Sequence, residues 1–158
     1  MTDEPEFSPD RELVLDRLLD APPAAVYRCW TDPDLIKRWY TPPPWRTTYV
    51  ELDVRAGGSN LIVIEGPNGE EASLRGVYLD VAPGERLVFT DAFVKAWEPS
   101  EHPFMTVTLT FAEEDGKTRY IARARHWTPA DRKRHEEMGF LEGWGVAADQ
   151  LEVVAKGL

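Results

Sequence analysis

Two titratable side chains occupy positions from which they could do chemistry. His126 ends an alternating stretch whose opposite face carries three arginines, so its imidazole is predicted to point inward. Asp91 shares the predicted inward face of Phe89 in an apolar stretch. An inward imidazole could orient a ligand or act as an acid–base catalyst, whereas a buried carboxylate is costly unless it is paired. Both residues are candidates for catalysis. The simpler interpretation is a histidine bonded to a backbone carbonyl and an aspartate bonded to Arg or His.

The other reactive residue types form no catalytic or metal-binding pattern. His102, His126 and His135 do not show the spacing of zinc ligands and have no cysteine partners. Cys29 is the single cysteine, which fits a reducing compartment and a small packed side chain. Gly57-Gly58 lies between predicted strands, so it indicates a turn and not a phosphate-binding loop. We expect neither a metal nor a cofactor.

The composition is that of one acidic globular domain. The chain has 158 residues, of which 42% are hydrophobic, and a formal net charge of −10. This charge argues against partners such as nucleic acid or anionic membranes, because both favour clustered Lys and Arg. Residues 1–10 are acidic and lack an apolar run, so we expect a frayed tail with no signal peptide or membrane span. Residues 11–158 are predicted to form a single cytoplasmic domain.

The hydrophobic pattern predicts an α+β fold with an antiparallel sheet. Residues 11–20 read as a strand, and residues 24–30 and 33–39 as two short helices that begin beside prolines. Turn signals, including an Asn-Gly and an Asp-Gly pair, then separate further strands. The strands expected between them are residues 47–55, 59–65, 71–81, 86–94, 104–113 and 118–127. Residues 128–158 read as one long helix, the only predicted helix able to cover such a sheet.

Small residues on two surfaces that should face each other suggest a cavity. Gly143 and Gly145 flank Trp144 beside the apolar stripe of the predicted C-terminal helix. A glycine inside a helix costs about 1 kcal/mol relative to alanine, so this arrangement needs a spatial reason. Ala122 and Ala124 are predicted to face the helix from the sheet. Either the two layers approach closely or a void separates them, and we favour a void lined by aromatic residues.

Several short motifs follow one another in the order found in one known family. They are Ala21–Tyr27, Thr31–Leu35 with Trp39, Gly57-Gly58, Gly76–Tyr78, Gly116–Thr118 and Gly143-Trp144. The stretches Thr90–Phe93 and His135–Phe140 are similar to a bacterial subgroup. With these motifs the chain resembles the activator-of-Hsp-90-ATPase-like branch of the START/Bet v 1-like (SRPBCC) superfamily. The resemblance implies a helix-grip fold, in which a curved antiparallel sheet of six to seven strands wraps round a long C-terminal helix.

The resemblance also implies a hydrophobic ligand cavity between the sheet and the helix. Members of the superfamily bind lipids, sterols, polyketides or plant hormones, and a few catalyse cyclisation. The loop 95–103 is long for a hairpin and is a candidate lid. We expect the cavity to be lined by Trp39, Tyr78, Phe89, Asp91, Phe93, Trp97, Phe104, Met105, Tyr120, Ala122, Ala124, His126, Phe140 and Trp144.

Three functions follow as hypotheses. The first is binding of a hydrophobic or amphipathic small molecule, such as a lipid or polyketide, without catalysis. The second is a protein-interaction module that regulates an Hsp-90-type chaperone partner, although the eukaryotic activators engage their chaperone through an additional N-terminal domain. The third is a cyclase- or hydrolase-like enzyme that uses His126 and Asp91. A homodimer formed through exposed sheet edges is also possible.

Overall fold

The protein is described here by a computed structural model that places residues 9–158, so most of the predicted N-terminal tail lies outside the described residues. The helices are α1 (Pro23–Thr31), α2 (Pro33–Ile36), α3 (Pro129–Glu137) and α4 (Phe140–Lys156). The strands are β1 (Glu12–Leu19), β2 (Arg46–Leu52), β3 (Ser59–Glu65), β4 (Glu71–Ala82), β5 (Arg86–Thr90), β6 (Phe93–Lys95), β7 (Glu98–Pro99), β8 (Met105–Glu114) and β9 (Lys117–His126).

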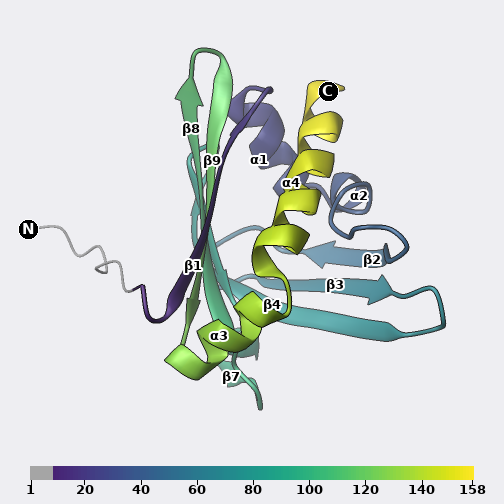
Figure 1. Cartoon of the computed structure of the whole chain (residues 1–158), viewed down its shortest axis with the longest axis vertical. Helices are drawn as coiled ribbons and strands as arrows, with labels where there is room; N and C mark the ends of the chain where they lie inside the picture. Colours follow the sequence, from purple (N-terminus) through teal and green to yellow (C-terminus); the bar gives the residue numbers. More distant parts are fainter. Residues whose placement is uncertain (1–8) are drawn as a thin grey trace, which may run out of the picture.

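One curved antiparallel sheet dominates the fold and confirms the helix-grip prediction. Its seven strands follow the order β1-β9-β8-β5-β4-β3-β2. In Figure 1, β1, β8 and β9 run along the long axis whereas β2, β3 and β4 run across it, and α4 lies in the angle between these two halves. The predicted strand 86–94 is shorter than expected, because β5 ends at Thr90 and the chain then forms a separate small hairpin, β6-β7.

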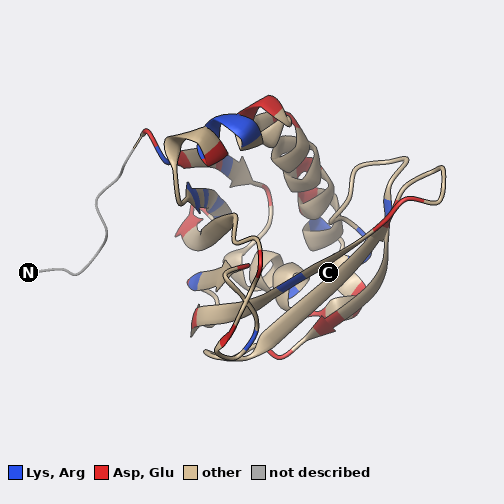
Figure 2. Ribbon diagram, turned by 90° about the horizontal axis from the view of Figure 1, so that it is seen from below, with Lys and Arg blue, Asp and Glu red and all other residues tan. Residues whose placement is uncertain are grey.

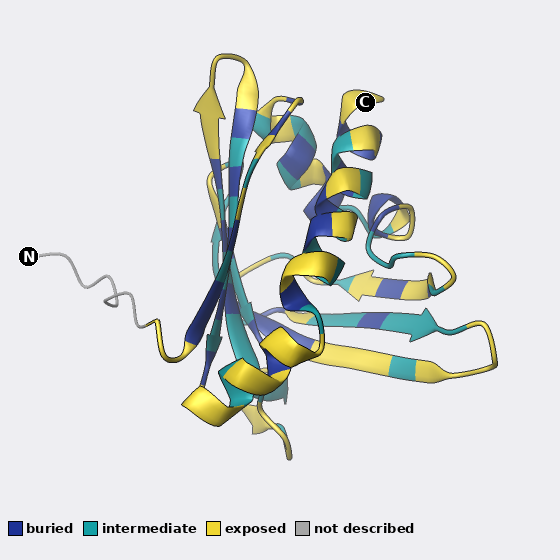
Figure 3. Ribbon diagram, in the orientation of Figure 1, coloured by how far each residue is buried: buried dark blue, intermediate teal, exposed yellow. Residues whose placement is uncertain are grey.

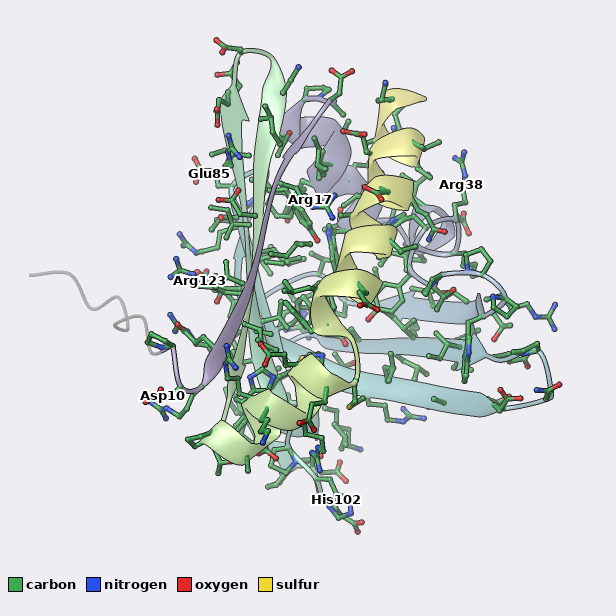
Figure 4. The ribbon with its side chains drawn as sticks, in the orientation of Figure 1. Asp10, Arg17, Arg38, Glu85, His102 and Arg123 are labelled. Atoms are coloured by element: carbon green, nitrogen blue, oxygen red, sulfur yellow. The ribbon has the colours of Figure 1, made fainter. Side chains whose placement is uncertain are left out.

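Strand register explains why the sheet buries one face. Leu109 of β8 and Leu15 of β1 both lie opposite Ala122 of β9, so their side chains share one buried row. On the other face, Arg119 bonds Asp16 and Glu114, and Figure 4 shows Arg123 on the side of the sheet away from α4. The predicted inward and outward faces of β8 and β9 are therefore confirmed. Figure 3 shows the same division, with buried residues where the sheet and helices face each other.

Turn chemistry is also as the sequence predicts. Asp115 and Gly116 both have positive φ, at 53° and 79°, and they form the two-residue connection between β8 and β9. Two consecutive positive φ values are typical of the type I′ turn, whose twist suits a tight hairpin. This turn fixes the register that places Ala122 and His126 on the buried face.

The prediction of one continuous C-terminal helix is wrong. The Thr128 hydroxyl caps α3 by accepting a hydrogen bond from the Asp131 N–H at 3.1 Å, but α3 ends at Glu137. Gly139 then adopts φ +93°, a left-handed conformation that no helix continues through, and α4 starts at Phe140. As a result α3 and α4 point in different directions: α4 packs along β1 and α1, whereas α3 contacts β9 and the start of β1.

The helix glycines do not leave the predicted void. A Cβ at Gly145 would lie 2.7 Å from a guanidinium nitrogen of Arg17, whose side chain extends from β1 and bonds Asp149 at 3.0 Å. Figure 4 shows Arg17 between β1 and α4. A Cβ at Gly143 would meet nothing within 4 Å. The Arg17 guanidinium therefore fills the space beside Gly145, and the volume argument for a cavity at this helix was wrong.

Charged residues lie mainly on the outside of the molecule. Figure 2 shows Lys and Arg positions scattered among those of Asp and Glu along the ribbon. Within residues 9–158, no helix combines the length and apolar character needed to cross a membrane.

The two glycines that border and occupy α4 make a matched pair for mutation. Gly139→Ala is expected to lower the free energy of unfolding by about 1–2 kcal/mol, because alanine disfavours left-handed backbone. Gly143→Ala is expected to raise it by about 0.5–1 kcal/mol, because the added methyl meets open space and alanine favours helix. Urea denaturation of both variants measures the difference. If Gly139→Ala is as stable as wild type, the left-handed break between α3 and α4 does not exist in solution.

Candidate functional site

A cavity of about 320 Å³ lies inside the β2–β5 half of the sheet. Its walls come from α1, α2, β2 to β5 and the segment 91–105 that leads into β8. Trp30, Ile36, Ile62 and Leu87 are buried wall residues, so most of the inner surface is apolar. Leu74, Val94, Ser100 and His102 line its outer part, and Figure 4 shows His102 at the lower end of the molecule, beyond α3.

Only part of the predicted cavity lining is found there. Of the predicted residues, Tyr78, Phe89, Asp91 and Met105 line this cavity. The other predicted residues lie elsewhere. Those in the packed core or next to it are Trp39, Tyr120, Ala122, Ala124, Phe140 and Trp144. Phe93, Trp97 and Phe104 belong to the segment 91–105, the mouth segment, but do not line the cavity. His126 lies outside the cavity, where it forms a hydrogen bond with His135.

The misplaced residues share a physical cause. Ala122 and Ala124 lie beside the leucines of the adjacent strand β1, and their side chains join the filled core against which α4 packs. The cavity forms in the other half, where the sheet turns away from α4 (Figure 1). Trp97 sits on the β6-β7 hairpin with 74% of its surface exposed, and it contacts Phe93 rather than the cavity.

Sequence reasoning missed wall residues that come from the two short helices and the edge strands. Trp30, Tyr40, Leu52 and Asn60 are the main ones. One signal was available, since Trp30, Trp39 and Tyr40 cluster around the proline-started helices. No sequence pattern indicated that Asn60 would line the cavity, because a polar residue near the start of a strand usually lies on a solvent-exposed face.

Trp30 anchors an aromatic cluster that separates the cavity from the core. Its ring centroid lies 4.8 Å from that of Trp39, 5.7 Å from Phe89 and 6.5 Å from Trp144. The Trp39 indole N–H donates to the Cys29 carbonyl at 3.0 Å. Burial raises the pKa of the Cys29 thiol to about 11, so this cysteine stays protonated and unreactive at neutral pH. The cluster holds α1, β5 and α4 together.

The inner wall carries hydroxyl groups that stay neutral. Burial raises the pKa of Tyr40 to about 12 and raises the pKa of Tyr78 further above its ordinary value. The pKa values of Tyr27 and Tyr120 are also raised by burial. At neutral pH these phenols are therefore uncharged hydrogen-bonding groups, and the charged residues of the cavity lining are Arg75 and Asp91.

Two buried donors in the cavity wall have no partner. Among the described residues, the buried side-chain nitrogen and oxygen atoms that make no hydrogen bond are Trp30 Nε1 and Asn60 Nδ2. Both residues line the cavity. Trp30 Nε1 lies beside the Tyr120 hydroxyl, although the two groups are not in hydrogen-bonding geometry. Its proximity partly offsets the rise that burial causes in the pKa of Tyr120.

Asp91 serves the backbone of the cavity mouth. One carboxylate oxygen accepts hydrogen bonds from the Phe104 N–H at 2.8 Å and the Met105 N–H at 3.1 Å. The expected bond to Arg or His is not what satisfies this group. Because Asp91 lines the cavity, its bonds fix the segment that enters β8 against the end of β5. This use of the carboxylate is structural.

His126 lies outside the cavity wall and is fully engaged in hydrogen bonds. Its Nδ1 is 2.9 Å from the Arg11 carbonyl, to which it donates, so Nε2 is left to accept from His135 Nδ1–H at 2.8 Å. The Phe104 ring lies 5.3 Å from the His126 ring and 5.0 Å from the His135 ring. The expected bond to a backbone carbonyl is present, and the pair joins β9 to α3.

Burial also decides the protonation of this histidine pair. It lowers the pKa of His126 and lowers the pKa of His135 to about 4, where the neighbouring His126 has a smaller effect in the same direction. Both imidazoles are therefore neutral at pH 7. Residues 9–158 bring together no group of three or more His, Cys, Asp or Glu side chains that could hold a metal ion.

Fold and cavity together define a helix-grip domain of the ligand-binding type. A family model described as activator of Hsp90 ATPase homolog 1-like protein matches residues 20–156. The chain therefore belongs to this family, as its sequence motifs predict. No protein among those with curated descriptions matches the sequence.

Solved structures of bacterial proteins share the fold. Protein NE0264 from Nitrosomonas europaea is 38% identical, with a TM-score of 0.92 over 96% of this chain and 97% of its own. Protein CV1439 from Chromobacterium violaceum is 26% identical, with a TM-score of 0.74 over 90% of this chain and 96% of its own. Protein Ms6760 from Mycobacterium smegmatis is 24% identical, with a TM-score of 0.79 over 97% and 95%, and this likeness concerns the fold alone.

The histidine pair predicts a stability that falls in mild acid. In the unfolded chain the imidazole of His135 binds a proton near pH 6.5, whereas burial in the folded protein lowers its pKa to about 4. Between pH 6.5 and pH 4 the unfolded state therefore holds more protons than the folded state. The free energy of unfolding should fall as pH drops through this window, with up to about 1.4 kcal/mol per pH unit from His135. In His135→Gln this part of the slope should disappear.

Urea denaturation at pH 7.0, 6.0 and 5.0 measures this slope. His102→Gln is the control, because His102 is exposed and outside the pair, and it should keep the wild-type slope. Equal slopes for wild type and His135→Gln would show that His135 is not held neutral by the fold.

Proposed function

We propose that this protein binds an apolar or amphipathic small molecule in the cavity inside the β2–β5 half of the sheet. The observation that carries the proposal is a cavity of about 320 Å³ whose walls are mainly aromatic and aliphatic, with a few polar groups and the charged residues Arg75 and Asp91. Small-molecule sites in proteins have this character and span about 300–1,000 Å³. Membership of a ligand-binding fold family supports the same conclusion.

Apolar burial supplies the driving force for binding. Removing apolar surface from water contributes about 25 cal/mol per Å² before the entropy of ordering the ligand is subtracted. Trp30, Leu87 and Phe89 offer such surface, and the neutral phenols avoid the cost of burying a charge. The polar groups in the wall then orient the ligand rather than hold it.

The mouth segment gives the ligand a way in. Val94, Ser100 and His102 belong to the segment between β5 and β8 and also line the cavity. Asp91 anchors the end of this segment, and Lys95 and Glu98 pair at 3.3 Å across the β6-β7 hairpin. A hairpin held at its base and by one exposed ion pair suits a lid, because exposed pairs contribute only about 0–1 kcal/mol.

Catalysis is not the function that this geometry favours. His126 is outside the cavity wall with both ring nitrogens engaged, and the Asp91 carboxylate holds two backbone amides. His126 has no ring nitrogen left to take a proton from a bound molecule, and one Asp91 oxygen is committed to the backbone amides of Phe104 and Met105. A carrier or sensor of the ligand needs only the cavity.

Filling the cavity tests the proposal. Leu52→Trp adds bulk at a wall position, so it should weaken binding of the uncharged fluorophore N-phenyl-1-naphthylamine by about tenfold or more through lost space. Leu18→Trp makes the same substitution on a strand outside the cavity and should bind like wild type. Fluorescence titration measures affinity, and thermal denaturation checks that both variants fold.

Two results would contradict the proposal. One is wild-type protein that shows no saturable binding of this fluorophore, of fatty acids of graded length or of substituted naphthalenes. The other is equal affinity of the fluorophore for both tryptophan variants, which would place the bound probe outside the cavity.

A further inference from the structure

Resting on the proposed function, we propose a ligand class for the cavity: an amphipathic anion, with an apolar body that fills the cavity and one carboxylate that binds Arg75 at its edge. Arg75 lines the cavity and also lines a second, more polar groove beside it. The proposal rests on this shared position and on how the charged groups around Arg75 are already paired.

The groove that adjoins the cavity has a volume of about 490 Å³. Asn60, Arg75 and Val94 line both spaces, so the two meet along these residues. The cavity wall is mainly apolar, whereas the groove lining includes Glu51, Arg75, Lys95 and Glu98. A molecule that crosses this boundary therefore needs an apolar part on one side and a polar part on the other.

The place of Arg75 suits a charged head group that stays in contact with water. Arg75 lies on β4 opposite Leu61 of β3, and its neighbours Leu74 and Gly76 also line the cavity. Its side chain is exposed. A long arginine stem can cover apolar surface while its guanidinium remains solvated. An anion that binds here is not transferred into the apolar interior, so it avoids most of the cost of burying a charge.

The other charged groups of the groove already have partners. The Glu51 carboxylate accepts a hydrogen bond from the Tyr49 hydroxyl at 2.8 Å, and Glu98 pairs with Lys95 at 3.3 Å. Within residues 9–158, no group forms a hydrogen bond or an ion pair with the Arg75 side chain. Arg75 is therefore the cation of these linings that is left to receive a charge from a ligand.

Asp91 is the anion of the cavity lining, and it would favour a cationic ligand if its charge were unused. One of its oxygens accepts from the backbone N–H groups of Phe104 and Met105, at 2.8 and 3.1 Å. Hydrogen bonds of this kind stabilise the ionised carboxylate. Because Arg75 has no corresponding partner, the edge of the cavity favours an anion over a cation.

A carboxylate fits this edge better than a phosphate does. A guanidinium can bind either group with two parallel hydrogen bonds. A phosphate monoester carries about 1.5–2 negative charges at pH 7, of which the one unpaired cation compensates only part. The remainder would lie close to Asp91, on a chain whose formal net charge is −10. One carboxylate matches one guanidinium.

Decanoate is the probe that tests this assignment, because it combines an alkyl chain with one carboxylate. Its affinity is measured by displacement of N-phenyl-1-naphthylamine. Arg75→Gln should weaken decanoate binding by about threefold to tenfold, since it removes a charge-assisted contact at an exposed position. The same variant should bind the uncharged fluorophore like wild type. Thermal denaturation checks that it folds, which is expected because Arg75 pairs with no described group.

Arg86→Gln supplies the matched control, since it makes the same change in net charge. Arg86 lies on β5, pairs with Asp80 at 2.7 Å and is outside the lining of both spaces. It should keep the wild-type affinity for decanoate. An equal loss in both glutamine variants would assign the effect to net charge, and no loss in Arg75→Gln would remove the role of Arg75. Either result overturns the ligand class.

Two further head groups complete the test on wild-type protein. Tighter binding of decylammonium than of decanoate would show that the edge selects a cation, and tighter binding of decyl phosphate would show that carboxylate is the wrong anion. Each of these results overturns the ligand class and leaves the proposed function standing. Absence of saturable binding by the fluorophore and by every decyl probe contradicts the proposed function itself.

Discussion

The packing of Trp30 is the interaction on which both the core and the cavity depend. Its ring meets Trp39, Phe89 and Trp144, which belong to different elements, and thereby holds α1 against β5 and α4. On its other side the same residue forms part of the cavity wall. A smaller side chain here would join the cavity to the core and remove the partition between them. Aromatic rings suit this task because each buries a large area in a fixed shape.

The cavity owes its position to the bend of the sheet rather than to missing bulk on the helix. α4 packs against β1 and α1, where Arg17 passes over Gly145 and the leucines of β1 lie opposite the alanines of β9. That half is filled. The strands β2 to β4 turn across the molecule (Figure 1), so the helix cannot cover both halves equally well, and the space stays open beside β3 and β4.

Some titratable groups hold parts of the structure together, and others line the cavity. His126 and His135 satisfy each other and join β9 to α3, and Asp91 satisfies two backbone amides at the cavity mouth. The wall itself contains neutral phenols and unpaired N–H groups. Buried polar groups are almost always paired in native proteins, and the two exceptions among the described residues, Trp30 Nε1 and Asn60 Nδ2, both belong to residues of the cavity lining.

The sequence alone determined most of the helices and strands and the faces of β8 and β9. Alternation placed Ala122 and His126 inward, and the Asp115-Gly116 pair predicted its hairpin turn, because both patterns depend on neighbours within the chain. The break at Gly139 escaped prediction, since a glycine in a helical pattern does not reveal whether its φ is negative or positive. Tertiary structure alone decided the cavity, the pairing of His126 with His135 and the wall position of Asn60. These depend on distances between elements far apart in the chain, and periodicity reports only how a side chain points from its own element.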